Sequence, residues 1–175
     1  MANPEPKDLT EWTQTAPAPM ARAIHEEPGE YGWLVRQADL LRAGRLDALD
    51  QQSLADLLNG MAISEMRALG SAMRVLLQHM LRVTVQPEKL TRSWLYTIAL
   101  QQDEAKALIK GHPGMRQHLP TIYADAYPRA RHLAAVETGI PESQFPAANP
   151  WTMDEALSYV PPEPSPRGRK AAQKR

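Results

Sequence analysis

Glu65 and His79 are the residues in the centre of the sequence whose types suit acid–base chemistry or metal binding. On a helix, both lie on one flank of the same apolar seam, but a rise of ~1.5 Å per residue places them about 21 Å apart. One metal ion or one proton transfer cannot use both. The paired Glu-x-x-His pattern of di-iron bundles and the His-Glu-x-x-His pattern are absent. The spacing therefore predicts no metal, cofactor or catalytic residue here.

A buried polar contact is the better interpretation of His79. Gln101 falls within the apolar face of the next predicted helix, seven positions after Trp94. A glutamine in an apolar stripe must be hydrogen-bonded, because leaving a buried hydrogen bond unmade costs ~1–3 kcal/mol. We expect His79, Trp94 and Gln101 to meet where two antiparallel helices pack, as a polar clasp that fixes their register.

The C-terminal tail carries a second candidate site. Its residues Arg167, Gly168, Arg169 and Lys170 resemble the Arg-Gly-Arg core of an AT-hook, with Lys170 in place of the usual proline. In that motif two arginines lie along a narrow A·T minor groove, and glycine avoids collision with the groove floor. These four residues are candidate DNA contacts, and a solubilising basic tail is the alternative interpretation. Any nucleic-acid contact of this kind would be weak and dependent on salt.

Composition excludes several classes of function. The chain has no cysteine, so disulfides, thiolate nucleophiles and cysteine-ligated zinc are impossible. A Gly-x-Ser-x-Gly elbow, a phosphate loop and a dinucleotide fingerprint are also absent, which weighs against an enzyme. The formal net charge is zero, so basic residues in the tail leave the rest of the chain mildly acidic. Without a long apolar run or secretory pattern, we expect a cytoplasmic protein without membrane contact.

The elements that must position these residues have helical periodicity. A regular three- and four-residue spacing joins Met66, Leu69, Met73, Leu76, Met80 and Val83 in one apolar seam. Arg74, Gln78 and Arg82 fall on the opposite face, and Pro87 ends the segment. The methionines of the seam are expected to fill a core, although such stripes also form peptide grooves.

Further helices are predicted on both sides of this segment. The first contains Trp33 and Gln37 and ends at Gly44. The second begins after the N-cap Asp50, and we expect Gly60 and Ser64 to kink or interrupt it. Three more are expected over residues 88–110, from about Pro120 to Thr138 with a kink at Pro128, and from a capping box at Thr152.

No segment alternates with a period of two, so the predicted fold is all-α: a four- to five-helix bundle with flexible tails. The bundle domain is expected over residues 29–158. Proline-rich residues 1–28 and the basic residues 159–175 are predicted to be disordered.

Several ordered sequence pieces together resemble the bacterial domain-of-unknown-function family 29. They are Trp33-x-x-x-Gln37, Leu40-Leu41-Arg42-x-Gly44, Leu54-Ala55, Ser64-Glu65, Leu76-Leu77-x-His79-x-Leu81, Gln86-Pro87, Trp94-x-x-Thr97-Ile98-x-x-Gln101, Glu137-Thr138-Gly139 and Phe145-Pro146. The resemblance covers about residues 30–158 and implies an all-α bundle without an assigned activity. Where the family usually has a glutamate cluster, this chain has Asp56-Leu57-Leu58-Asn59, so an acidic site there would be reduced.

Three functions remain open from the sequence. The first is a non-enzymatic helical module that binds a protein partner or forms a homo-oligomer, which the bundle pattern favours. The second is a DNA-associated protein that uses the tail residues Arg167–Lys170. The third, a metal-dependent or acid–base enzyme using Glu65, His79 or the region of Asp56, is disfavoured by the helix spacing.

Overall fold

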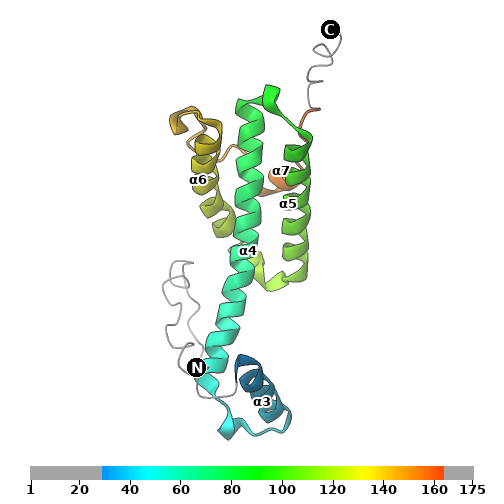
Figure 1. Ribbon diagram of the computed structural model, residues 1–175, viewed down its shortest axis with the longest axis vertical. Helices are drawn as coiled ribbons and strands as arrows, with labels where there is room; N and C mark the ends of the chain where they lie inside the picture. Colours follow the sequence, from blue (N-terminus) through cyan, green and yellow to red (C-terminus); the bar gives the residue numbers. More distant parts are fainter. Residues whose placement is uncertain (1–28, 164–175) are drawn as a thin grey trace, which may run out of the picture. The chain divides into compact units, whose positions relative to one another are not determined.

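The computed structural model describes residues 29–163 (Figure 1). Across this range the chain forms α-helices joined by short turns and no strand, which confirms the predicted all-α class. The helices are α3 (Glu30–Arg42), α4 (Gln51–Val85), α5 (Arg92–Gly111), α6 (Leu119–Thr138) and α7 (Met153–Leu157). Short 3₁₀ turns lie between them: η1 (Leu46–Ala48), η2 (Pro87–Lys89), η3 (Pro113–His118) and η4 (Glu142–Gln144). The predictions for residues 1–28 and for Arg167–Lys170 lie outside the described residues.

The chain divides into two compact units, Met1–Glu65 and Met66–Arg175. We call their described parts the N-terminal unit (residues 29–65) and the C-terminal unit (residues 66–163). The N-terminal unit holds α3, η1 and the first part of α4, and the C-terminal unit holds the remainder. The range that the sequence predicts as one bundle domain therefore contains two units.

In the N-terminal unit, α3 ends as its sequence predicts. Gly44 has a φ of 68°, a left-handed conformation that glycine adopts without steric cost. The Gly44 N–H donates to the Leu41 carbonyl and the Arg45 N–H donates to the Leu40 carbonyl, at 3.1 and 3.0 Å. These two bonds form a Schellman motif, which satisfies carbonyls left open at the end of the helix.

The start of α4 is held by α3. The Asp50 carboxylate accepts from the Ser53 N–H at 3.1 Å, which confirms Asp50 as the N-cap. In turn, the Asp50 N–H donates to the Gln37 side-chain oxygen at 3.0 Å. Hydrogen bonds from Ser53, and a weaker one from Trp33, lower the pKa of Asp50 because they stabilise its charged form. The Trp33-x-x-x-Gln37 spacing thus places two side chains of α3 at one helix terminus.

The predicted interruption near Gly60 and Ser64 is wrong, because α4 runs unbroken from Gln51 to Val85. A glycine within a helix costs only about 1 kcal/mol relative to alanine and keeps its backbone hydrogen bond. A proline would remove a backbone N–H donor, but Gly60 and Ser64 both keep theirs. The helix therefore continues through both residues.

The core of the C-terminal unit lies along α4, which is flanked by α5 and α6 (Figure 1). Seam residues Leu69, Met73, Leu76, Met80 and Val83 are buried, as the spacing predicts, and Met66 is half-buried. Leu77 and Leu81 are also fully enclosed, although they lie beside the seam. Helices on two sides of α4 require a wider apolar face than one seam supplies.

The other helices begin and end close to their predicted positions, with one correction. Helix α5 starts at Arg92 rather than near Glu88, because Pro87–Lys89 form η2 and the Thr91 hydroxyl accepts from the Trp94 N–H. Helix α6 has Pro120 in its first turn and ends before Gly139, whose φ is 71°. It continues past Pro128, which is exposed.

The chain after α6 is tied back to the bundle by polar side chains. Gln102 on α5 donates to the carbonyls of Ala156 and Tyr159, both at 2.9 Å. On α6, the Tyr127 hydroxyl donates to the Pro146 carbonyl at 2.7 Å. The predicted capping box is present, since Thr152 and Glu155 each bond the other's backbone N–H. Residues 145–160 thereby close the C-terminal unit.

Candidate functional site

Arg82 occupies an unexpected position on α4. The seam pattern predicts it on the solvent face, but only 8% of its surface is exposed. The prediction fails because both α5 and α6 pack against α4. Arg82 lies away from the apolar seam, but it still faces Trp94 of α5 and Glu137 of α6. A buried guanidinium is costly unless it is paired and hydrogen-bonded. Its partners therefore identify the most strongly constrained polar cluster of the C-terminal unit.

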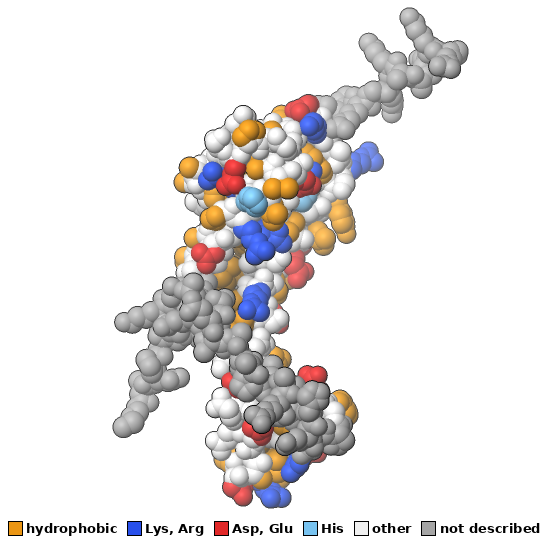
Figure 2. Space-filling model, turned by 60° about the vertical axis from the view of Figure 1, so that its left-hand side comes forward, with side chains coloured by type: hydrophobic (Ala, Val, Ile, Leu, Met, Phe, Trp, Pro, Cys, Tyr) orange, Lys and Arg blue, Asp and Glu red, His pale blue; other side chains and the backbone are white. Residues whose placement is uncertain are grey.

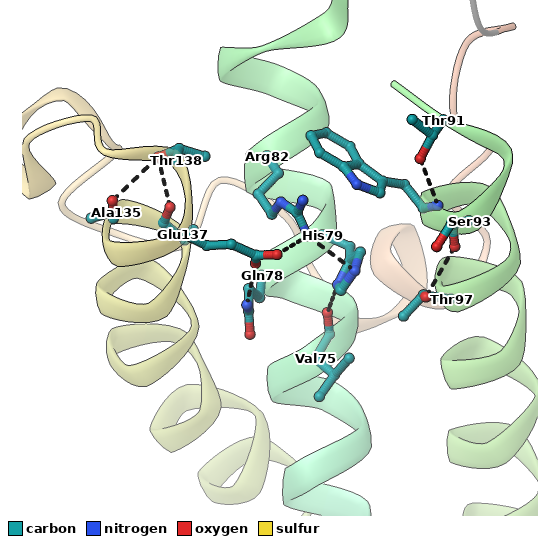
Figure 3. Close-up of polar contacts among 12 residues, drawn as sticks. Val75, Gln78, His79, Arg82, Thr91, Ser93, Thr97, Ala135, Glu137 and Thr138 are labelled. Carbon is teal, nitrogen blue, oxygen red and sulfur yellow. Dashed lines mark hydrogen bonds and ion pairs between the residues drawn. The ribbon is translucent and has the colours of Figure 1, made fainter. Parts of the chain in front are cut away.

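Three helices supply the partners of Arg82 (Figure 3). Its Nη1 lies 2.7 Å from Oε1 of Glu137 on α6 and 3.3 Å from Nε2 of His79 on α4. Its guanidinium carbon lies 3.8 Å from the centre of the Trp94 ring on α5, within cation–π distance. Gln78 donates from Nε2 to the second oxygen of Glu137 at 2.8 Å. We call Gln78, His79, Arg82, Trp94 and Glu137 the Arg82 cluster.

The bonds of His79 define its protonation state. Nδ1 lies 3.0 Å from the Val75 carbonyl, which only accepts, so Nδ1 must carry a proton. Arginine only donates, so Nε2 must present its lone pair to Arg82. The contacts require the neutral imidazole protonated on Nδ1. A general base needs a free lone pair, and here Arg82 occupies it.

Electrostatics agree with this assignment. Burial is the largest cause that lowers the pKa of His79, and the positive charge of Arg82 lowers it further. The bond to Val75 and the charge of Glu137 oppose these effects without cancelling them. Burial also lowers the pKa of Arg82, while Glu137 raises it. The cluster is thus a charged pair beside a neutral histidine.

The predicted clasp of His79, Trp94 and Gln101 has a different centre. His79 and Trp94 do come together, but through Arg82, which contacts both. Gln101 is half-buried on α5, and no hydrogen bond joins it to His79 within the described chain. The expected register contact is therefore carried by Arg82 and Glu137 between α4 and α6, and by Arg82 and Trp94 between α4 and α5.

Periodicity could not identify Arg82, Glu137 and Gln78 as members of this cluster. Arg82 and Gln78 lie on the predicted polar face, and Glu137 is in the last turn of its helix, directly before Thr138. A usable signal was the family pattern itself, in which Glu137 directly precedes Thr138 and Gly139. A glutamate near the C-terminus of a helix is destabilised by the negative end of the helix dipole. Its presence there therefore suggests a compensating contact with a positive charge.

On the continuous helix α4, Glu65 precedes His79 by about four helical turns, so one metal ion cannot bind both. No group of three or more histidine, aspartate or glutamate side chains within residues 29–163 is arranged to hold a metal ion. In the same range, no helix is long and apolar enough to cross a membrane.

Glu142 forms a second, more exposed set of contacts with Arg131 and His132, at 3.5 and 3.1 Å.

Fold and cluster together define an all-α helical protein in which one arginine links three helices. A family model, Domain of unknown function DUF29, matches residues 27–160, and the chain belongs to that family. The match confirms the resemblance carried by the sequence pieces from Trp33 to Pro146. Neither the curated proteins nor the solved structures include one that matches the chain.

Proposed function

We propose that this protein is a non-enzymatic helical module that binds another protein through the exposed apolar faces of α3 and of α4 residues 51–65. One observation carries the proposal: the N-terminal unit leaves several large apolar side chains in solvent, while only Trp33 and Ile63 among its described large apolar side chains are buried. The exposed members of this apolar surface are Tyr31, Val35, Leu41, Leu46, Leu58 and Met61. Large apolar side chains left in solvent on adjacent helical turns are typical of interaction surfaces.

The distribution of these side chains supports binding of a helix or another flat apolar surface. Tyr31 and Val35 are one helical turn apart on α3, and Leu58 and Met61 are one turn apart on α4. Such spacing matches the way amphipathic helices engage their partners. The occupied lone pair of His79 supports the non-enzymatic part of the proposal.

Site-specific photo-crosslinking in the cells that naturally make the protein tests this function. A photoreactive phenylalanine derivative replaces Tyr31 or Met61, and mass spectrometry identifies the adducts. Tyr96, which is 68% exposed on α5, is the matched control position. We expect a discrete protein adduct from Tyr31 and Met61 and none from Tyr96. Equal labelling at all three positions, or no adduct at Tyr31 and Met61, would refute the proposal.

A second candidate function rests on the tail sequence Arg167-Gly168-Arg169-Lys170. We propose weak DNA contact by these residues, because two arginines flanking a glycine suit a narrow A·T minor groove. Electrophoretic mobility shifts with the full chain and with a chain lacking residues 161–175 test it. Binding should require the tail and weaken steeply with salt. Retention of binding after the deletion would remove this candidate.

A further inference from the structure

The two units of the chain carry opposite net charges when histidine is counted as neutral. Residues 1–65 contain 11 acidic and 5 basic side chains, which gives a net charge of −6. Residues 66–175 contain 9 acidic and 15 basic side chains, which gives +6. Five of those basic side chains belong to residues 164–175, so the folded helices can attract an anion only where their own basic side chains gather. Such a gathering lies along α4 and α6.

Helix α4 carries two arginines on one side of its second half. Arg67 and Arg74 are seven residues apart, which is two helical turns, so they lie on the same face of the helix. Arg67 is exposed, and Arg74 is half-buried with its Nη2 donating to the Ser71 hydroxyl at 3.3 Å. One turn further on, Gln78 donates to Glu137 of α6 at 2.8 Å. The face of α4 that holds the two arginines therefore borders α6.

Helix α6 brings a third arginine to this border. A side-chain methyl carbon of Ile122 lies 3.7 Å from the position that a Cβ atom on Gly70 would occupy, so the two helices are in contact at this level. Arg129 follows Ile122 by two helical turns and is exposed. We call Arg67, Arg74 and Arg129 the arginine face. Figure 2, which turns the α6 side of Figure 1 forward, shows basic side chains gathered on this side of the C-terminal unit.

The arginine face keeps its positive charge. None of its three arginines forms an ion pair among residues 29–163. Glu137, which borders the face, is already paired with Arg82 at 2.7 Å. Asp125 lies one turn before Arg129 on α6, so one carboxylate stands against three guanidinium groups. The face therefore has a surplus of positive charge available to an external anion.

Guanidinium groups at this spacing suit the phosphate backbone of a duplex. Two helical turns place Arg67 and Arg74 about 10 Å apart along α4. A duplex carries one phosphate charge about every 1.7 Å of its axis, so separate phosphates lie within reach of each arginine. A guanidinium also bonds two phosphate oxygens at once, a geometry that the ammonium group of lysine does not match.

We infer that the arginine face binds the phosphate backbone of duplex DNA, beside the contact proposed for residues 167–170. The inference rests on the second candidate function, to which it adds a surface of folded helices. Phosphate contacts fix position without reading sequence, so the face supplies affinity and the tail supplies the preference for A·T pairs. DNA is favoured over an acidic protein because the same unit continues into the Arg167-Gly168-Arg169 pattern.

Fluorescence anisotropy of a labelled A·T-rich duplex, titrated with the full chain at several salt concentrations, tests the inference. Each phosphate contact contributes about 0.9 to the slope of log affinity against log salt concentration. The triple variant Arg67→Gln/Arg74→Gln/Arg129→Gln should therefore lower the slope by about 2–3 and the affinity at least about tenfold. The matched control Arg92→Gln/Lys106→Gln/Lys110→Gln removes the same charge from exposed positions of α5 and should bind nearly like the natural chain.

A lysine version of the arginine face separates lost contacts from lost folding. The variant Arg67→Lys/Arg74→Lys/Arg129→Lys keeps the charge and should keep the salt slope. Equal loss for the glutamine variant and the α5 control, or displacement of the duplex by an equal charge of polyglutamate, would overturn the inference. If the glutamine variant binds like the natural chain while deletion of residues 161–175 abolishes binding, the tail contact stands and the arginine face is excluded. Binding that survives the deletion but is lost in the glutamine variant supports the arginine face and removes the tail contact.

Discussion

Leu69, Leu76 and Met80 of the C-terminal unit are fully enclosed, whereas Tyr31, Leu58 and Met61 of the N-terminal unit are largely in solvent. Leu69, Leu76 and Met80 all lie on helix α4, and so do Leu58 and Met61. The difference comes from neighbours. Residues 66–85 of α4 have α5 and α6 beside them, while residues 51–65 share a unit only with α3 and η1 among the described elements.

Polar contacts differ between the units in the same way. The C-terminal unit uses buried Arg82 and partly exposed Glu137 to link helices that are already packed. The N-terminal unit uses Gln37 and Asp50 to hold one helix terminus. Amphipathic helices therefore form a closed core in the C-terminal unit and leave apolar side chains exposed in the N-terminal unit.

The largest expected effect separates buried leucines from exposed ones. Leu76→Ala should lower the free energy of unfolding by about 2–5 kcal/mol, because it leaves a cavity in a fully enclosed site. Leu58→Ala, the matched change on the same helix, should cost less than about 1 kcal/mol in dilute protein. Urea unfolding monitored by circular dichroism measures both. Equal losses would show that the two stretches of α4 are packed alike.

A second comparison concerns Glu137 on α6 and Glu142 on η4, the two glutamates that form ion pairs in the described part of the C-terminal unit. Glu137→Gln leaves the buried Arg82 cation without its charged partner and should cost about 1–3 kcal/mol, reduced from the fully buried case because Glu137 is partly in solvent. Glu142→Gln breaks the more exposed contacts with Arg131 and His132 and should cost less than about 1 kcal/mol. Thermal unfolding of both variants is the measurement. A larger loss for Glu142→Gln would contradict the structural role of Arg82.

Asp50 offers a test within the N-terminal unit. Asp50→Ala removes the cap of α4 and should cost about 1 kcal/mol locally, since the Ser53 N–H loses its acceptor. Asp50→Asn keeps a side-chain oxygen and serves as the control. Hydrogen exchange should accelerate in the first turn of α4 and leave α5 unchanged. Faster exchange throughout both units would mean that they unfold together.

The smallest effect is the pH dependence contributed by His79. Its pKa is lower in the folded chain than in the unfolded one, chiefly through burial. The unfolded state therefore binds the proton more readily, and stability should fall as the pH drops below the unfolded value of about 6.5. His79→Gln should reduce this slope. Unfolding at a series of pH values measures it, and an unchanged slope in the variant would exclude His79 as its source.

Sequence alone predicts much of this molecule because local signals agree with the fold. Gly44, Asp50 and Thr152 mark helix ends by their own chemistry, and the seam from Leu69 to Val83 identifies the core. These features depend on neighbours within one or two turns. They are therefore visible in the order of residues.

What the sequence did not predict depends on which helix lies beside which. Arg82 is buried because α6 brings Glu137 to the face that a single seam leaves polar. Gln101 has the right position on its helix, yet Arg82 takes the contact with His79. Gly60 and Ser64 have a weak local preference for a break, and the continuity of α4 overrides it.

Hydrogen exchange along α4 tests the central claim most directly. Most apolar side chains of α4 residues 66–85 are enclosed by neighbouring helices, whereas Leu58 and Met61 are exposed. Amides of residues 66–85 should therefore be protected more strongly than amides of residues 51–65 on the same helix. Equal protection along the whole of α4 would contradict this difference between the two units.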